Sequence, residues 1–442
     1  MKSSVKAIEP TKVLFVTIAA TAVFVYGAAV GRYQIFPFGQ IQFAWGSLKQ
    51  VIAERDTILG VRPTFLVEPA RHQGEGVTRN EKSAFPGLTL IAAFFNDELE
   101  FRLVGMDGTI VNVWPANFHD IFPDPSHIKP TDQIPQTNWN AGIQGGLALP
   151  DGSVVFTFEG LGAAKLDRCG AVQWTVPVMT HHSVESDRAG GFWIAGARYV
   201  ERRGVFPAMR PPYIEDTILH VSAHGKVTQE IPLFSLFAEN QLESLLFANG
   251  LEDLRVPDPM DMTHLNDIEE LSTDLAPGFP RFAAGDLLIS LRNYNLLMVV
   301  DPRTRKVKWW KIGPWNKQHD PDFAPNGRIV VFNNNADGTP TGSILGGSRL
   351  VELDLDTNEI TTLYGANPNE KMFTNFRGRH ERLPNGNVLI TESQAGRVFE
   401  IDAQNNVVWE FINRFDEKSV AIVGMASRYP RDYFQVADWS CR

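Results

Sequence analysis

Residues 399–412 read FEIDAQNNVVWEFI, which is an apolar strand, a polar turn and a second strand that carries aromatic side chains. Five other segments repeat this pattern: FRLVGMDGTIVNVW from Phe101, AKLDRCGAVQWTV from Ala164, LHVSAHGKVTQEI from Leu219, VVDPRTRKVKWWKI from Val299 and VELDLDTNEITTLY from Val351. The copies follow one another at roughly 50 to 80 residues, a spacing typical of propeller blades with insertions.

A second kind of hairpin precedes most of these copies. Its examples are LPDGSVVFTF from Leu149, AGGFWIAG from Ala189, AGDLLISL from Ala284, PNGRIVVF from Pro325 and PNGNVLIT from Pro384. Each turn carries a glycine, which tolerates the positive φ that tight hairpin turns require. A two-sheet sandwich is the alternative, but six like units favour radial closure, which leaves only short strand edges. We therefore predict an all-β chain that folds as a six-bladed β-propeller over residues 83–442.

The N-terminus differs from this repeating region. Val13–Val30 contains no charged residue, and Lys2, Lys6 and Lys12 precede it. This length fits a membrane span, and the lysines favour a cytoplasmic tail at residues 1–12. We expect a transmembrane anchor at residues 13–31, with a cleaved signal peptide as the alternative. Residues 32–82 are predicted to be a partly helical connector.

Composition and cysteine content limit the possible partners and compartments. The 442 residues carry a formal net charge of −10, which argues against a nucleic-acid partner. The two cysteines are Cys169, in an expected hairpin turn, and the penultimate residue Cys441. In an oxidising compartment they either pair and fasten the C-terminal tail to a blade, or remain two free thiols.

Histidines precede four of the turn-and-strand units at similar offsets. They are His182, His264, His319 and His380. Equivalent positions of different blades are related by rotation about the axis, so these side chains are expected to gather at one mouth of the channel. His181 is adjacent to His182, and neighbouring residues of a strand face opposite ways, so only one of the two is expected to face this mouth.

Histidine clusters support metal binding, acid–base catalysis or nucleophilic catalysis. Arg292 and Arg379 occur beside these histidines in the repeat. Guanidinium groups repel a bound cation but hold tetrahedral oxyanions through paired hydrogen bonds. The mixture of residues therefore indicates an oxyanion site, and we expect no metal and no soluble cofactor. Asp320 and Asp322, beside His319, remain weaker candidates for orienting its ring or binding a cation.

Three segments together resemble a known family. They are DMTHLNDIEEL from Asp261, LLISLRNYNLLMVVD from Leu287 and QHDPDFAPNGRIVVFNNN from Gln318. In this order they are similar to the bacterial arylsulfotransferases that use no nucleotide sulfate donor, with the resemblance covering about residues 140–412. It implies a periplasmic six-bladed propeller that moves a sulfuryl group from a phenolic sulfate ester to a phenol through a sulfohistidine intermediate. Here the anchor and connector stand where those enzymes have an N-terminal β-domain.

The resemblance also implies roles for individual residues. His319 matches the nucleophilic histidine, His264 and Asn266 match sulfate contacts, and Arg292 matches the sulfate-binding arginine. A further active-site histidine corresponds to His181 or His182, and we favour His182 because its offset to the following glycines matches that of His319.

The remaining assignments concern the rim of the site and its surroundings. His181, Arg379 and His380 are candidate substrate-binding residues, beside the catalytic set of His182, His264, His319 and Arg292. The resemblance places the catalytic domain in the periplasm, and the anchor expected from the apolar N-terminal run would hold it, as a single-pass segment, in the bacterial inner membrane. The expected partners are a small aryl sulfate and a phenolic acceptor, and the oligomeric state stays open. The alternatives are a propeller hydrolase acting on a sulfate ester or lactone, and a non-enzymatic binding propeller.

Overall fold

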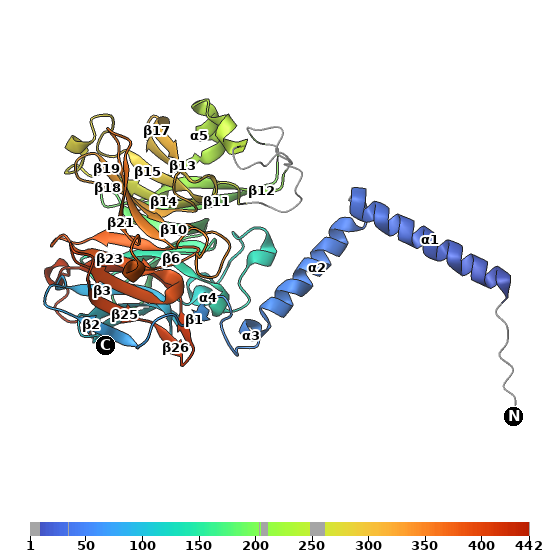
Figure 1. The fold of residues 1–442 in the computed structure, drawn as a ribbon, viewed down its shortest axis with the longest axis horizontal. Coiled ribbons are helices and arrows are strands. Elements are labelled where there is room, and N and C mark those ends of the chain that lie inside the picture. Colours follow the sequence, from blue (N-terminus) through green and yellow to red (C-terminus); the bar gives the residue numbers. More distant parts are fainter. Residues whose placement is uncertain (1–8, 34, 203, 205–210, 248–260, 442) are drawn as a thin grey trace. The chain divides into compact units, whose positions relative to one another are not determined.

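The computed structural model describes residues 9–33, 35–202, 204, 211–247 and 261–441, and the chain divides into two units, Met1–Thr64 and Phe65–Arg442 (Figure 1). The first unit contains α1 (Pro10–Tyr33), α2 (Phe38–Ala53) and α3 (Arg55–Ile58). The helix α1 has 24 residues, and its length and apolar composition are sufficient to cross a membrane. This confirms the predicted apolar N-terminal helix.

The second unit consists mainly of antiparallel strands, which form six sheets of four or five strands in the described residues. The first two sheets are β6 (Ile143–Ala148), β7 (Val154–Phe158), β8 (Gly162–Leu166) and β9 (Val172–Val176), and β10 (Met179–Ser186), β11 (Phe192–Val200), β12 (Tyr213–Val221) and β13 (Val227–Pro232). The next two are β14 (Leu265–Glu270), β15 (Leu287–Leu291), β16 (Leu296–Asp301) and β17 (Lys306–Ile312), and β18 (His319–Ala324), β19 (Arg328–Asn333), β20 (Arg349–Asp354) and β21 (Ile360–Tyr364). The last two are β22 (Arg379–Arg382), β23 (Val388–Glu392), β24 (Arg397–Ile401) and β25 (Val407–Ile412), with β2 (Gly76–Asn80) at its edge, and β28 (Val423–Tyr429), β3 (Leu88–Phe95), β4 (Glu98–Gly105) and β5 (Ile110–Pro115).

The predicted hairpins are confirmed in all six sheets. The repeat quoted first forms β24 and β25, and its five relatives form β4–β5, β8–β9, β12–β13, β16–β17 and β20–β21. The glycine-containing turns join the first strand of a sheet to its second, as at Gly152, whose φ of +81° favours glycine. Several inner strands, such as β7, β16 and β24, are buried along their whole length, because each sheet packs apolar side chains against a neighbouring sheet on either face. One such core lies between β7 and β11 and includes Val155, Val184 and Ile194.

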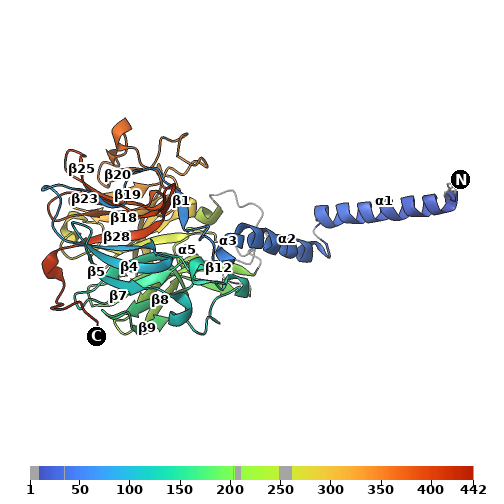
Figure 2. The same ribbon diagram turned by 90° about the horizontal axis from the view of Figure 1, so that it is seen from below.

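The six sheets close into a ring through their first strands. Each first strand contacts the next one, in the order β6, β10, β14, β18, β22 and β28. The last of them, β28, contacts β6 and closes the ring. The strand β28, near the C-terminus, pairs with β3 and so completes the sheet that the start of the unit begins (Figure 2). This propeller-like closure makes the first strands the lining of a common axis.

A side-chain acceptor on each first strand also binds a backbone N–H of the next one. The pairs are Gln144 with His182, Ser183 with Ile268, Glu269 with Phe323, Asp320 with His380, Glu381 with Arg428 and the Tyr429 hydroxyl with Ala148. These bonds satisfy buried N–H groups at the junctions between sheets, which explains several polar residues in strands that otherwise read as core.

The β-rich unit begins earlier in the chain than residue 83. The strand β1 (Val67–Pro69) pairs with β27 (Ser419–Ala421), which pairs with β26 (Arg414–Asp416), and β2 extends the sheet of β22–β25. The end of the connector predicted at 32–82 therefore contributes two strands. Two short helices, α4 (Phe118–Ile121) and α5 (Leu233–Glu239), lie in the connections.

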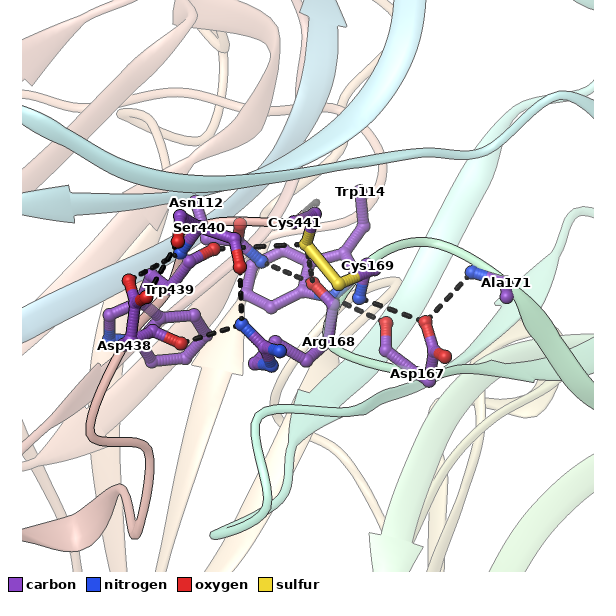
Figure 3. The surroundings of a disulfide bond; sticks show 10 residues. All are labelled: Asn112, Trp114, Asp167, Arg168, Cys169, Ala171, Asp438, Trp439, Ser440 and Cys441. Atoms are coloured by element: carbon purple, nitrogen blue, oxygen red, sulfur yellow. Dashed lines mark hydrogen bonds between the residues drawn. A yellow bond between two sulfur atoms is a disulfide. The ribbon is translucent and has the colours of Figure 1, made fainter.

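The two cysteines form a disulfide that holds the C-terminal tail. Cys169 and Cys441 are bonded, and Figure 3 shows the tail lying against the turn between β8 and β9. Arg168 donates to the carbonyl oxygens of Asp438 and Ser440 beside the bond. Of the two possibilities left by the sequence, pairing is therefore confirmed.

Candidate functional site

Three of the four predicted histidines meet at one end of the ring axis. His182 lies on β10, His264 directly precedes β14, and His319 begins β18. The ring centroid of His182 is 4.8 Å from that of His264 and 6.0 Å from that of His319. Neighbouring first strands thus bring together residues that are far apart in the sequence.

A backbone irregularity changes the expected orientation of the histidine pair. His182 has a φ of 55°, in the left-handed region, and the pairing of β10 with β11 shifts between His181 and Val184. The two rings therefore contact each other, with 2.9 Å between their Nδ1 atoms. The prediction that the two side chains face opposite ways is wrong, because the bulge interrupts the alternation on which it rested.

His319 is buried and held in one tautomer. Its Nδ1 lies 2.8 Å from Asn334 Oδ1, an acceptor, so Nδ1 carries the proton, and Nε2 accepts a bond of 3.1 Å from the Arg377 backbone N–H. Burial and the positive charge of Arg292 lower the pKa of His319 to about 3. The ring is therefore neutral near pH 7, with its lone pair on Nε2.

His182 and His264 have different electrostatic surroundings. Burial, with the charges of His264 and His181 next in weight, holds the pKa of His182 well below its ordinary value. The backbone N–H and Nδ1 of His264 both contact the carboxylate of Asp261. His264 is thus oriented by an acid, whereas His182 is kept neutral.

Behind His182, a buried chain of polar groups leads away from the site. His181 Nε2 lies 3.2 Å from Asp216 Oδ1, and Asp216 also accepts from Thr263 and from the Leu265 N–H. Burial lowers the pKa of His181, but the hydrogen bond and charge of Asp216 outweigh it and raise that pKa above 6.5. Burial raises the pKa of Asp216, and His181 reverses this to a net lowering.

This pair predicts a pH-dependent contribution to stability. The pKa of His181 is higher in the folded chain than the 6.5 of the unfolded chain, so binding of the proton stabilises the fold. This stabilisation is fully present below pH 6.5 and is lost as the pH rises through the pKa of the folded chain. Asp216→Asn removes the charge that raises it. We expect the gap in melting temperature between wild type and Asp216→Asn to be widest near about pH 5 to 6 and to narrow towards about pH 9. Thermal unfolding across this range checks it, and a gap that does not change with pH would contradict the assignment.

Three cationic side chains lie around the histidines. Arg292, in the 3-10 helix Arg292–Tyr294 that follows β15, is half-buried, and its Nε has no hydrogen-bond partner among the described residues. Lys317 donates to Asn293, and burial followed by the charge of Arg292 lowers its pKa. Arg377 pairs with Glu159 at 2.9 Å. Their charges favour an anionic ligand at this end of the axis.

Two cavities lie beside these groups. One of about 40 Å³ is lined by His182, His319, Asn266, Arg377 and Arg379, among other residues. Asn266 donates to the Gln318 carbonyl oxygen, and its buried Oδ1 has no partner among the described residues. By the space that one water needs, this cavity holds about three water-sized groups.

The second cavity, of about 150 Å³, is less polar. Its walls include Met179, Ala197 and Ile214, with His181 and His264. His182 and Gln144 line both cavities, so the two spaces meet at the histidines.

Most of the predicted site residues are thus found together, with two exceptions. The charge of Arg292 acts on His319, but the side chain lines neither cavity. His380 lies between Asp320 and Asp322 and also lines neither cavity. Arg379 lines the smaller cavity and pairs with Asp320. Sequence reasoning missed four contributors: Arg377, Lys317, Asp216 and Asn334. Of these, Asn334 and Lys317 fall within or next to the quoted segment that contains His319, and that position was the available signal.

Comparisons with known proteins give a family and several similar folds. The family model described as "Arylsulfotransferase (ASST)" matches residues 146–414. No curated protein matches the chain. A protein of unknown function from Bacteroides caccae is a similar solved structure, with 16% identity, a TM-score of 0.47, and coverage of 76% of this chain and 99% of that chain.

Two further solved structures are also similar. A catalytically inactive virginiamycin B lyase from Staphylococcus aureus with quinupristin has 11% identity and a TM-score of 0.36, covering 67% of this chain and 86% of that chain. The WD40 domain of Pan2 from Neurospora crassa has 12% identity and a TM-score of 0.38, covering 76% of this chain and 85% of that chain.

Proposed function

The chain belongs to the arylsulfotransferase (ASST) family, and from this premise we propose that it transfers a sulfuryl group from a phenolic sulfate ester to a phenolic acceptor, without a nucleotide donor. The observation that supports this proposal best is the meeting of His182, His264 and His319 beside a small cavity. The walls of this cavity include Arg377 and Arg379, together with Asp267 and Asp320. A neutral imidazole is a nucleophile, and arginines favour a tetrahedral oxyanion next to it.

In the first half-reaction, Nε2 of His319 attacks the sulfur atom and the bond from sulfur to the aryl oxygen breaks. Nε2 must first release the Arg377 N–H, which can then donate to an oxygen of the transferring group. In the free enzyme this N–H donates to the ring, and during transfer it would donate to the sulfuryl oxygens. The change of partner would stabilise the transition state. The sulfated ring keeps its Nδ1 proton against Asn334.

The leaving oxygen and the acceptor need a proton carrier. We assign this role to His264, which the carboxylate of Asp261 contacts at Nδ1, so that its Nε2 is available to the substrate. It gives a proton to the departing phenolate, then takes the proton of the acceptor phenol as that oxygen attacks sulfur and the bond from nitrogen to sulfur breaks. His182, with its lowered pKa, stays neutral and contacts the sulfuryl group.

The two cavities suit the two parts of such a substrate. The smaller one, with Asn266, Arg377 and Arg379 in its walls, would hold the sulfuryl group. The larger one would hold an aryl ring against Met179, Ala197 and Ile214. Arg292 acts from outside these walls through its charge.

We also propose the arrangement of the whole chain. The six sheets would be the blades of one six-bladed β-propeller, which forms the catalytic domain predicted at residues 83–442. The helix α1 would place residues 13–31 in the bacterial inner membrane, with residues 1–12 in the cytoplasm and the propeller in the periplasm. The disulfide supports an oxidising compartment for the propeller.

The test uses the full chain in detergent with 4-nitrophenyl sulfate. We expect intact-mass spectrometry to show a gain of one sulfuryl group, and added phenol to discharge it and speed nitrophenol release. Nitrophenol release that does not depend on phenol would indicate a hydrolase. A folded protein with neither adduct nor release would indicate a binding propeller.

A further inference from the structure

A second cluster, of two carboxylates and an imidazole, lies next to the three histidines, and the proposed reaction does not use it. Its members are Asp320 and Asp322 on β18 and His380 on β22. His380 Nδ1 is 3.0 Å from Asp320 Oδ2, and His380 Nε2 is 3.3 Å from Asp322 Oδ2. We propose that Asp320, Asp322 and His380 bind a divalent metal ion inside the ring.

The buried imidazole of His380 distinguishes this cluster from a group of acidic residues alone. The residue is 6% exposed, and its Nδ1 makes no hydrogen bond to any described residue despite the carboxylate 3.0 Å away. A buried polar atom without a hydrogen bond is costly, and a ligand between the groups would satisfy it.

The separations suit a shared ligand. One ligand atom from each of the three residues lies within 4.8 Å of the others. A divalent ion holds its ligands at about 2.0 to 2.4 Å, so two ligands on opposite sides of it are at most about 4.8 Å apart. Because Nδ1 faces Asp320 and Nε2 faces Asp322, one of the two ring nitrogens would bind the ion, and the carboxylate on the other side would move towards it.

The charge of the surroundings favours a cation. Arg379 interacts with four carboxylates, those of Asp320, Asp267, Asp322 and Glu185. One guanidinium cannot neutralise four acids, and like charges this close oppose one another's ionisation. Arg379 Nε binds Asp320 Oδ1, at 3.1 Å, which leaves Oδ2 on the side of His380. The positive charge of Arg379 therefore offsets only part of the negative charge around the cluster.

The ligand types narrow the choice of ion. Two carboxylates with one imidazole suit Mn²⁺ or Zn²⁺ better than Ca²⁺ or Mg²⁺, which prefer oxygen ligands alone. The side chain of Asp322 is 33% exposed, so an ion and its water ligands have a path to the site. This assigns to Asp320, Asp322 and His380 a role other than substrate binding, and it departs from our expectation of a chain without metal.

The test measures metal binding directly and needs no turnover. Full-length protein in detergent is treated with a chelator, desalted and titrated with Mn²⁺, whose free form is counted by electron paramagnetic resonance. We expect about one Mn²⁺ per chain, competition by Zn²⁺, and a rise in melting temperature with either ion. Asp322→Asn and His380→Gln are each expected to weaken binding at least about tenfold.

A matched control is available in another sheet. Asp187 contacts a histidine too, with its Oδ2 2.5 Å from His220 Nε2, but no described second acid completes a metal-binding group there. Asp187→Asn is therefore expected to bind Mn²⁺ like the wild type. No tight Mn²⁺ or Zn²⁺ site in the wild type, or equal binding in Asp322→Asn, would overturn the proposal and leave His380 as a side chain that contacts two carboxylates. The rise in melting temperature of the wild type with added metal reports binding without any variant. The proposal can therefore be tested even if a variant fails to fold.

Discussion

His319→Ala is expected to lower the turnover of 4-nitrophenyl sulfate by about 10⁴-fold or more and to abolish the sulfuryl adduct. Removing the nucleophile removes the covalent route that we propose and leaves only direct transfer between donor and acceptor. The loss should appear in kcat, because His182, Asn266 and Arg377 still line the cavity that we assign to the sulfuryl group. Steady-state rates and intact mass, measured on the same preparations, check both parts.

Two comparisons separate a chemical role for His319 from a structural one. His319→Gln keeps a side-chain amide that can bond Asn334, so its folding should be close to that of the wild type while the adduct is still lost. His220→Gln replaces a histidine that also has a polar partner but lies outside the site, and it should keep its activity. An adduct that persists in His319→Ala, mapped to His182 or His264, would move the nucleophile to that residue.

The local part of this fold can be predicted from the sequence. Each hairpin joins neighbours in the chain, so two apolar strands and a polar turn are enough to locate it, and in the second kind of hairpin the turn also carries a glycine, as at Gly152. The closure of the ring is different in kind. The pairing of β28 with β3 joins residues more than three hundred positions apart, and no local pattern in Val423–Tyr429 specifies its partner. The same holds for β1 and β2, which pair with strands from the other end of the unit.

The candidate site shows the same division. Repeat position was sufficient to bring His182, His264 and His319 together, because rotation about the axis relates equivalent strand starts. It was insufficient for His380, which lies between two acids. His380 precedes its turn glycine, Gly386, by six residues, whereas His182 and His319 precede theirs by eight. The difference arises from the bulges in β10, β14 and β18, whereas the pairing of β22 with β23 is regular. Such a bulge adds one or two residues to the first strand and moves every preceding residue by that number of positions.

Arg377 illustrates a further limit. It precedes β22, outside any quoted motif, and enters the site because its N–H reaches His319 and its side chain reaches Glu159. Its φ of 58° is in the left-handed region, which arginine seldom adopts. Such strain often accompanies a functional position, but it becomes apparent only in the structure.

Arg292→Gln is expected to lower kcat by about 10² to 10³-fold, which is the second-largest effect that we predict. Negative charge grows on the sulfuryl oxygens and the leaving phenolate during transfer, so a nearby guanidinium stabilises the transition state more than the bound substrate. Arg292→Lys keeps the charge but loses the planar fork, and we expect it to recover only part of the rate.

The pH profile distinguishes this explanation from an effect on the nucleophile. Burial is the largest cause of the low pKa of His319, and Arg292 is the second, so removing Arg292 raises that pKa without restoring its ordinary value. The ring then remains neutral at about pH 7, and the rate of Arg292→Gln should be low but nearly flat between about pH 7 and about pH 8. A rate that recovers steeply over this interval would mean that Arg292 acts mainly by keeping His319 deprotonated. Arg281→Gln, which removes an exposed arginine bonded to the Leu355 carbonyl oxygen, provides the control for a lost surface charge.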